Sequence, residues 1–347
     1  MDGGMSRAEF LKGSMALGVV ASMGSAAAED APASAKARVT EVDSLRIWFL
    51  ADNYYDANRP DGKGFKRFRS LGGRSMHAEH GLSFYVETVV AGKTGAFLFD
   101  FGLDPVGVAN NVSLLGLDVW KANAFCLSHG HYDHFTSAVS LLGKNREWIA
   151  EGTPFFAGEE AFLRRYKFRP GSADPTDLGQ LRREDLEGLR LDVVEVRSAR
   201  EVVPGAYLTG PIARVTPYEK VPPAYLVKRR EKIEPDDFPG EQGLFFAVKG
   251  KGLVVLSGCA HSGIVNTVKQ AQKSSGVEKV HAILGGFHLV DSRQQDIPVT
   301  VADIKAFKPD VLVPAHCTGF EAAVAFSREM PEQFVLNTSG TQYTFGA

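Results

Sequence analysis

The sequence predicts an α/β fold in which short strands alternate with helices, and two observations lead to this prediction. From about Arg46 onward, runs rich in aromatic and β-branched residues alternate with helix-like runs. The 36 glycines and 17 prolines imply many turns, which argues against a helical bundle. With 347 residues, of which 44% are hydrophobic, the chain is long and apolar enough to bury a large core.

The first half of the chain is expected to contribute four strands and one helix. Aromatic and β-branched residues between turn residues predict strands at 46–51, 82–90, 96–100 and 124–128. The last of these is short and apolar, and a polar cluster separates it from a helix expected at 135–142.

The second half repeats the alternation without an internal repeat of fixed period. The expected strands are 244–248, 253–257, 280–284, 311–314 and 334–338, and the expected helices are 263–273, 299–307 and 320–329. Two long polar stretches that carry glycine and proline, 53–81 and 214–240, are typical of functional loops.

Charge and cysteine content exclude several classes of protein. The chain has 39 basic and 41 acidic side chains, so no overall positive field favours nucleic acid. Three cysteines cannot form a disulfide framework for a small scaffold. The expected partner is a small-molecule substrate, and no segment is long and apolar enough for a stable membrane span.

The N-terminus has the order of an export signal. A basic start at Arg7 precedes an apolar stretch that ends in three alanines at Ala28. The start resembles the twin-arginine pattern, with Ala8 in place of the second arginine. We therefore expect a signal at 1–28, a linker at 29–43 and one domain at 44–347. The expected location is periplasmic or otherwise exported, or cytoplasmic if this degenerate signal is not used.

A dense polar cluster follows the short strand at 124–128. Its sequence, Ser-His-Gly-His-Tyr-Asp-His, places three of the nine histidines within a few residues. His129 and His131 can point the same way on an extended loop, and Asp133 and His134 can turn toward a second ion. Imidazole and carboxylate ligands suit zinc, iron or manganese. The cluster therefore predicts a metal site.

The His-x-His-x-Asp-His pattern at 129–134 resembles the motif of the metallo-β-lactamase superfamily. The segment 98–102 is similar to an earlier strand of that family that ends in Asp-x-Gly, which implies that Asp100 supports the metal loop. The fold that the resemblance implies is an αββα sandwich with the metal site at one edge of its two sheets.

Three further clusters each follow a short apolar run. They carry Cys259 with His261, His288, and His316. Shorter motifs lie at His80 (Glu-His-Gly-Leu-Ser), at 209–212 (Thr-Gly-Pro-Ile) and at Glu241 (Glu-Gln-Gly-Leu). Together they resemble one branch of the superfamily, the proteins similar to 7,8-dihydropterin-6-methyl-4-(β-D-ribofuranosyl)aminobenzene 5′-phosphate synthase.

The resemblance implies two divalent metal ions, with zinc expected and manganese or iron as alternatives. Between His134 and His261 the chain has no histidine, so His261 is the nearest residue that can replace the usual third ligand. The expected ligands are His129, His131 and His261 for one ion, and Asp133, His134 and His316 for the other.

Several roles stay open at this point. Cys259 stands where some lactamases carry a thiolate ligand, but we favour a small buried cysteine at a tight turn. His288 is expected to act as a proton donor or substrate contact rather than as a ligand, and Asp133 could also accept a proton. His80 and Glu241 are expected to support the ligands or to contact the substrate.

The expected function is a metal-dependent hydrolase in which a hydroxide on two metal ions attacks a small ester, phosphoester or lactone. The alternatives are a phosphoribosyl transferase similar to the synthase, or a metal- or ligand-binding protein without turnover. Basic side chains on the two long loops could meet an anionic substrate. They are Lys63, Lys66, Arg67, Arg69, Arg74, Lys228, Arg229 and Arg230.

The signal prediction can be tested by fractionation and N-terminal sequencing. We expect the chain to be recovered outside the cytoplasm and to begin directly after Ala28, since the small residues there suit a signal peptidase. A chain found only in the cytoplasmic fraction, starting at Met1 or Met5, would contradict the export prediction.

Overall fold

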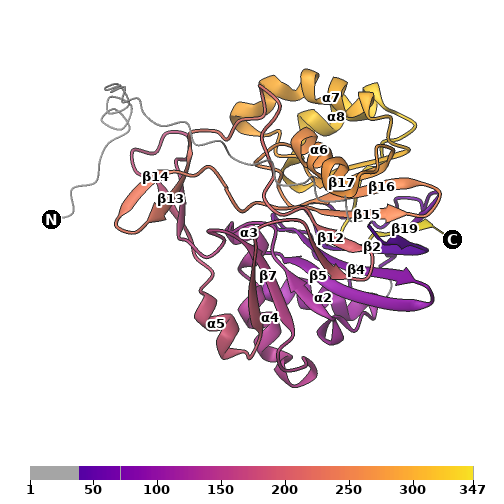
Figure 1. Cartoon of the computed structure of the whole chain (residues 1–347), viewed down its shortest axis with the longest axis horizontal. Helices are drawn as coiled ribbons and strands as arrows, with labels where there is room; N and C mark the ends of the chain where they lie inside the picture. Colours follow the sequence, from indigo (N-terminus) through magenta and orange to yellow (C-terminus); the bar gives the residue numbers. More distant parts are fainter. Residues whose placement is uncertain (1–38, 71, 347) are drawn as a thin grey trace, which may run out of the picture.

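The computed structural model describes residues 39–70 and 72–346, and within them the chain folds into four layers. Two large β-sheets pack face to face, and helices cover the outer face of each sheet (Figure 1). This arrangement confirms the expected αββα sandwich. The expected signal and residues 29–38 of the expected linker lie outside the described residues.

Sheet I has eight strands among the described residues, in the order β10-β7-β6-β5-β4-β2-β19-β3. They are β2 (Ser44–Ala51), β3 (Phe65–Lys66), β4 (Ser83–Val90), β5 (Lys93–Phe101), β6 (Ala124–Cys126), β7 (Pro154–Gly158), β10 (Asp192–Val196) and β19 (Gln342–Gly346). Four helices pack on its outer face: α2 (Pro105–Leu115), α3 (Tyr132–Phe135), α4 (Ala138–Lys144) and α5 (Arg183–Gly188).

Sheet II has seven strands among the described residues, with the order β11-β12-β15-β16-β17-β18 and β1 paired to β15. They are β1 (Glu41–Val42), β11 (Arg200–Val203), β12 (Ala206–Leu208), β15 (Leu244–Val248), β16 (Gly252–Ser257), β17 (Val280–Gly286) and β18 (Val311–Ala315). Its outer face is covered by α6 (Ile264–Ser275), α7 (Ile297–Ala306) and α8 (Phe320–Glu329). Because β1 joins this sheet, the last residues of the expected linker are part of the fold.

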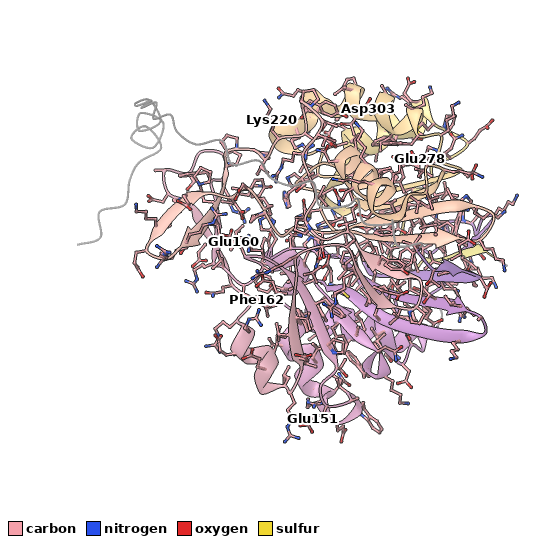
Figure 2. The ribbon with its side chains drawn as sticks, in the orientation of Figure 1. Glu151, Glu160, Phe162, Lys220, Glu278 and Asp303 are labelled. Carbon is pink, nitrogen blue, oxygen red and sulfur yellow. The ribbon has the colours of Figure 1, made fainter. Side chains whose placement is uncertain are left out.

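A small third sheet projects from the sandwich, next to the loops at one edge (Figure 1). Its order is β14-β13-β8-β9, with β8 (Arg165–Lys167), β9 (Thr176–Gly179), β13 (Tyr225–Arg229) and β14 (Lys232–Pro235). Arg229 bonds to Glu160 at the base of this sheet, and Figure 2 shows where Glu160 lies. The remaining short elements are the 3-10 turns η1 (Val119–Lys121), η2 (Arg146–Trp148), η3 (Asp291–Asp296) and η4 (His316–Thr318).

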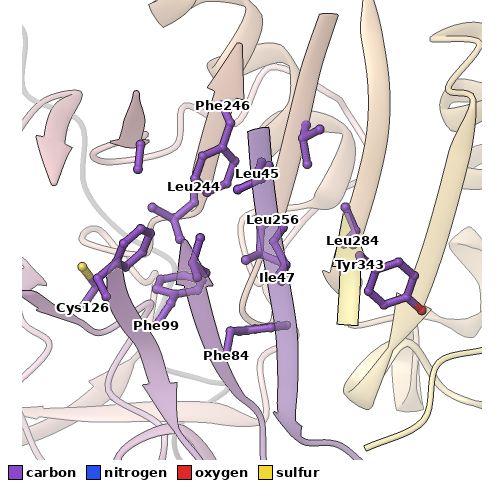
Figure 3. Packing of buried hydrophobic residues seen from close by; sticks show 14 of the residues in the cluster. Leu45, Ile47, Phe84, Phe99, Cys126, Leu244, Phe246, Leu256, Leu284 and Tyr343 are labelled. Atoms are coloured by element: carbon purple, nitrogen blue, oxygen red, sulfur yellow. The ribbon is translucent and has the colours of Figure 1, made fainter. Parts of the chain in front are cut away.

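The main core lies between the two large sheets and explains why their inward residues are apolar. Phe84 and Phe99 from sheet I face Phe246 and Leu256 from sheet II, and all four are fully buried (Figure 3). The ring of Phe49 meets that of Phe84 edge-on, with centroids 4.6 Å apart, a favourable arrangement for aromatic pairs. Sheet burial on both faces matches the nearly continuous apolar runs of these strands.

The expected strand at 334–338 is wrong, and the last strand of the described chain is β19 instead. Phe334 makes only one isolated bridge, to Leu312. The carbonyl of Leu336 then accepts from the guanidinium of Arg67, and the side chain of Asn337 donates to a buried carboxylate. Side-chain hydrogen bonds thus replace the strand ladder in a segment of strand-like composition.

The topology brings the polar clusters to one edge. β5 and β6 are parallel neighbours in sheet I, and β16, β17 and β18 are parallel neighbours in sheet II. Helices α6 and α7 return the chain between the parallel strands of sheet II, as parallel pairing requires. The carboxyl ends of these strands therefore deliver their loops to the same edge. None of the described helices has the length and apolar character of a membrane span.

Candidate metal centre

The four strand-end loops bring nitrogen, oxygen and sulfur ligands together in a buried cluster. The groups of three ligand atoms within 4.8 Å of one another include His129–Cys259–His261, His134–Cys259–His316, Cys259–His288–Cys317 and His80–Asp133–His316. Every ligand predicted from the sequence lies in or beside this cluster and is at least nine-tenths buried. Cys317 was not predicted as a site residue, because a single cysteine next to His316 does not form a metal-binding motif of its own.

The first group joins the loop after β6 to the loop after β16. Nδ1 of His131 lies 3.1 Å from Nε2 of His261, and the rings of His129 and His261 are 4.8 Å apart. Two nitrogens on one tetrahedral zinc ion lie about 3.3 Å apart, given Zn–N bonds of about 2.0–2.1 Å. The side chains of His131 and His261 are therefore already spaced for a shared ion.

The second group adds the loop after β18. Nε2 of His316 lies 3.3 Å from Oδ2 of Asp133, and Nε2 of His134 lies 3.1 Å from Sγ of Cys259. Cys259 belongs to both groups, so its sulfur lies between them. The tight turn expected at this cysteine is present, since Ala260 has φ of 58°.

The protonation and burial of these side chains fit metal binding. Burial lowers the pKa of His129, His131 and His261 well below the ordinary value, so their rings are neutral at pH 7 and keep a lone pair. Nε2 of His129, Nδ1 of His261 and Oδ1 of Asp133 are buried without a hydrogen-bond partner among the described residues. Buried polar atoms normally have a partner, and a divalent cation would supply it.

Asp100, at the end of β5, fixes the first loop as the resemblance implied. Its Oδ1 accepts from the Ser128 N–H (2.7 Å), and Oδ2 accepts from the Ser128 hydroxyl (2.7 Å) and lies 2.6 Å from Nδ1 of His134. Although burial opposes it, the carboxylates of Asp100 and Asp133 raise the pKa of His134. A contact from Nδ1 to Asp100 leaves Nε2 of His134 directed at the cluster.

Two more buried carboxylates fix the other loops in the same way. Glu241 accepts from the backbone N–H groups of His261 (2.6 Å) and Ser262 (2.5 Å). Asp52 accepts from the His316 N–H (2.9 Å) and from the Asn337 amide (2.7 Å). Glu241 was expected to support the ligands or to contact the substrate, whereas Asp52 was not predicted. Asp52 could have been identified from the sequence, because it also follows an apolar strand.

Gly258 allows the two sheets' loops to approach closely. A Cβ at this position would lie 2.2 Å from Oγ of Ser128 and 3.0 Å from Oδ2 of Asp100. Such distances are not tolerated by real side chains, so only glycine lets the loop after β16 reach the loop after β6.

His288, expected as a proton donor or substrate contact, lines the cavity beside His261, with ring centroids 4.2 Å apart. Its Nε2 lies 3.0 Å from the hydroxyl of Tyr225, which reaches in from β13 of the small sheet. Burial lowers the pKa of His288 well below its ordinary value, so the ring is neutral at pH 7. Tyr225 was not among the site residues predicted from the sequence.

His80 lies at the mouth of the cluster. Its side chain is 57% exposed, with Nε2 3.5 Å from Oδ2 of Asp133 and its ring 4.9 Å from that of His316. Burial and the neighbouring His316 lower the pKa of His80. It can therefore contact both the second ligand group and an incoming molecule.

A cavity of about 310 Å³ opens beside these ligands. Its walls carry Lys167 and Arg169, but none of the basic residues that we expected to meet an anionic substrate. Two of those residues have other partners: Arg67 donates to Leu336 and Thr338, and Arg229 pairs with Glu160. Any anion recognition in this cavity must therefore come from the strand β8 and the residues after it.

Two known proteins are similar to this chain in sequence. The chain is 31% identical over 299 residues to the 7,8-dihydropterin-6-methyl-4-(β-D-ribofuranosyl)-aminobenzene-5′-phosphate synthase of Methanocaldococcus jannaschii, covering 85% of this chain and 95% of the synthase. An uncharacterised protein of the same organism is 27% identical over 259 residues, 74% of this chain and 90% of that protein. No family model matches the chain.

Solved structures are also similar. The crystal structure of Tm1679, a metal-dependent hydrolase of the β-lactamase superfamily, matches with a TM-score of 0.67 and 25% identity. The match covers 87% of this chain and all of that chain. This likeness agrees with the sandwich.

The buried carboxylate behind the first loop should be essential for stability. Asp100→Ala leaves the Ser128 N–H and the His134 ring without their acceptor, and we expect the free energy of unfolding to fall by about 3–5 kcal/mol. Urea unfolding of the metal-loaded and chelator-treated protein measures the change. Asp310→Ala is the matched control, because Asp310 contacts His281 at 2.6 Å while its side chain is 56% exposed. Its cost should stay below about 1 kcal/mol, and equal costs would contradict the role of Asp100.

Proposed function

This chain belongs to the metallo-β-lactamase superfamily, in the branch of the dihydropterin synthase, and we propose that it is a two-metal hydrolase of a small ester or phosphoester. The observation that carries the proposal is the pair of overlapping ligand groups that share Cys259 and face one cavity. The similar structure of Tm1679, a metal-dependent hydrolase, supports the same reaction class.

The proposed ligands follow the two groups. One ion would be held by His129, His131 and His261, and the other by Asp133, His134 and His316. We add Cys259, which belongs to both groups, as a candidate ligand in place of the purely structural role expected from the sequence. Burial raises the pKa of its thiol well above the ordinary value, so its deprotonation would require a bound ion. Histidine, carboxylate and thiolate together suit zinc better than magnesium or calcium.

A pair of bound divalent ions supplies a nucleophile at neutral pH and stabilises developing negative charge. The chain's own residues would do the rest. Although burial opposes it, His134 and His316 keep the pKa of Asp133 well below its ordinary value, so its carboxylate stays ionised and would hold the second ion. His288 is neutral at pH 7 and is oriented by Tyr225, so it suits a hydrogen bond to substrate better than storage of a proton. Burial of the cluster limits the access of bulk water.

One observation favours a second candidate, a group transfer like that of the synthase. The identity of 31% extends over most of both chains, so the two proteins share more than a fold. The cavity volume favours the hydrolase, since about 310 Å³ is at the lower end of the range for small-molecule sites.

Metal content tests the ligand assignment. The purified protein should carry close to two zinc ions per chain, because six side chains from three strand-end loops are assigned as ligands. Elemental analysis should show that His131→Ala loses metal and activity together, whereas His288→Ala keeps metal and loses turnover. Fewer than about half an ion after zinc or manganese supplementation would refute the site. Loss of one ion in His288→Ala would make His288 a ligand.

Activity tests the reaction class. We expect turnover of small carboxylic esters or phosphoesters that is abolished by a chelator and restored by zinc or manganese. The comparison reaction is the formation of the compound in the synthase's name, 7,8-dihydropterin-6-methyl-4-(β-D-ribofuranosyl)-aminobenzene 5′-phosphate. Metal-dependent formation of that compound without ester turnover would establish the alternative, a reaction like that of the synthase. Metal binding without either activity would establish a binding protein.

A further inference from the structure

We propose that Lys167 and Arg169 form an anion subsite in the cavity and hold the phosphate group of a small phosphate-bearing substrate. The inference rests on the proposed function in taking the metal-side wall of the same cavity as the reactive end. Lys167 belongs to β8 of the small sheet and Arg169 follows that strand, whereas the ligand groups come from the sandwich. The substrate would bridge the two.

The strand β8 and the residues after it supply the two cations. Lys167 ends β8, and Arg169 lies two residues beyond the end of that strand. Arg165, at the start of β8, is buried, donates to Asp236 at 2.7 Å and lies within 3.4 Å of the Gly130 carbonyl, so its charge is neutralised beside the first metal loop. Lys167 and Arg169 line the cavity.

The charge balance of the walls favours an anion. Among the described residues that line the cavity, Asp133 is the only carboxylate, and it lies 3.3 Å from His316 and 3.5 Å from His80.

Two cations match a phosphate monoester better than a carboxylate. A phosphate monoester carries a charge of about −1.5 to −2 at pH 7, and arginine can bind two of its oxygens. Arg169 lines the cavity together with Tyr132, and Nζ of Lys167 lies 4.7 Å from the centre of the Tyr225 ring. The ring of Tyr225 thus limits the movement of Lys167.

The rest of the wall indicates a small ring or chain beside the phosphate. Tyr132, Leu178, Tyr225 and Val290 supply aromatic and apolar surface. A cavity of about 310 Å³ leaves room for one ring in addition to a phosphate group. The probe of choice is therefore phenylphosphonate, a dianion that cannot be hydrolysed at its P–C bond.

Calorimetric titration of the metal-loaded full chain with phenylphosphonate tests the proposal. We expect Arg169→Gln and Lys167→Gln each to weaken binding by about tenfold or more, with unchanged metal content, because each removes one charge-assisted contact. Arg164→Gln is the matched control. Arg164 is exposed on the other side of the same segment and donates to Asp177 at 2.9 Å, so its loss should change the affinity by less than about twofold.

Further measurements separate the subsite from the proposed hydrolase function. Benzoate should bind more weakly than phenylphosphonate, and Arg169→Lys should recover part of the lost affinity. Wild-type affinity in both glutamine variants, or an equal loss in Arg164→Gln, would overturn the subsite. Ester turnover that does not depend on Arg169 would support the proposed function and reject the subsite. Phenylphosphonate binding that depends on Arg169, in a protein without metal-dependent activity, would support the subsite and reject the proposed function.

Discussion

Three buried carboxylates, placed behind the ligand loops rather than among the ligands, determine the rest of this structure. Asp100, Glu241 and Asp52 each accept hydrogen bonds from the loop that carries a ligand histidine. A buried carboxylate is costly unless several donors satisfy it, so each one specifies the path of its loop. Their negative charges also lie close to the ligand loops, which makes the whole cluster favourable for cations. The proposed chemistry depends on this support.

Backbone strain marks the same loops. Asp100, Ala260, His288 and His316 all have positive φ, between 42° and 60°, at or directly after strand ends. For residues other than glycine this conformation costs free energy, and it persists only where the surroundings over-determine it. Here the parallel strands on one side and the buried hydrogen bonds on the other provide that constraint. The side chains are therefore presented to the cavity by a backbone that has little freedom to move.

The sandwich and most of the candidate ligands were predictable because each histidine cluster follows an apolar run, and parallel strands bring such clusters to one edge. The contribution of the small sheet was not predictable. Tyr225 lies in a long polar stretch, and Lys167 ends a short strand with no alternating apolar pattern, two residues before Arg169. Their role depends on pairing between segments far apart in sequence. The strand expected at 334–338 failed for a related reason, since its composition is strand-like while its polar groups bond to side chains such as Arg67.

The separate small sheet has an evolutionary consequence. Its strands come from two excursions of the chain, and its contact with the reactive end is made by side chains such as Tyr225 rather than by the loops that carry the ligand set. Substitutions on β8 or β13 can reshape one wall of the cavity while Asp100, Glu241 and Asp52 keep their partners. The fold thus separates the supports of the ligand loops from one wall of the cavity, so a substitution in that wall can alter the fit of a substrate without removing the supports.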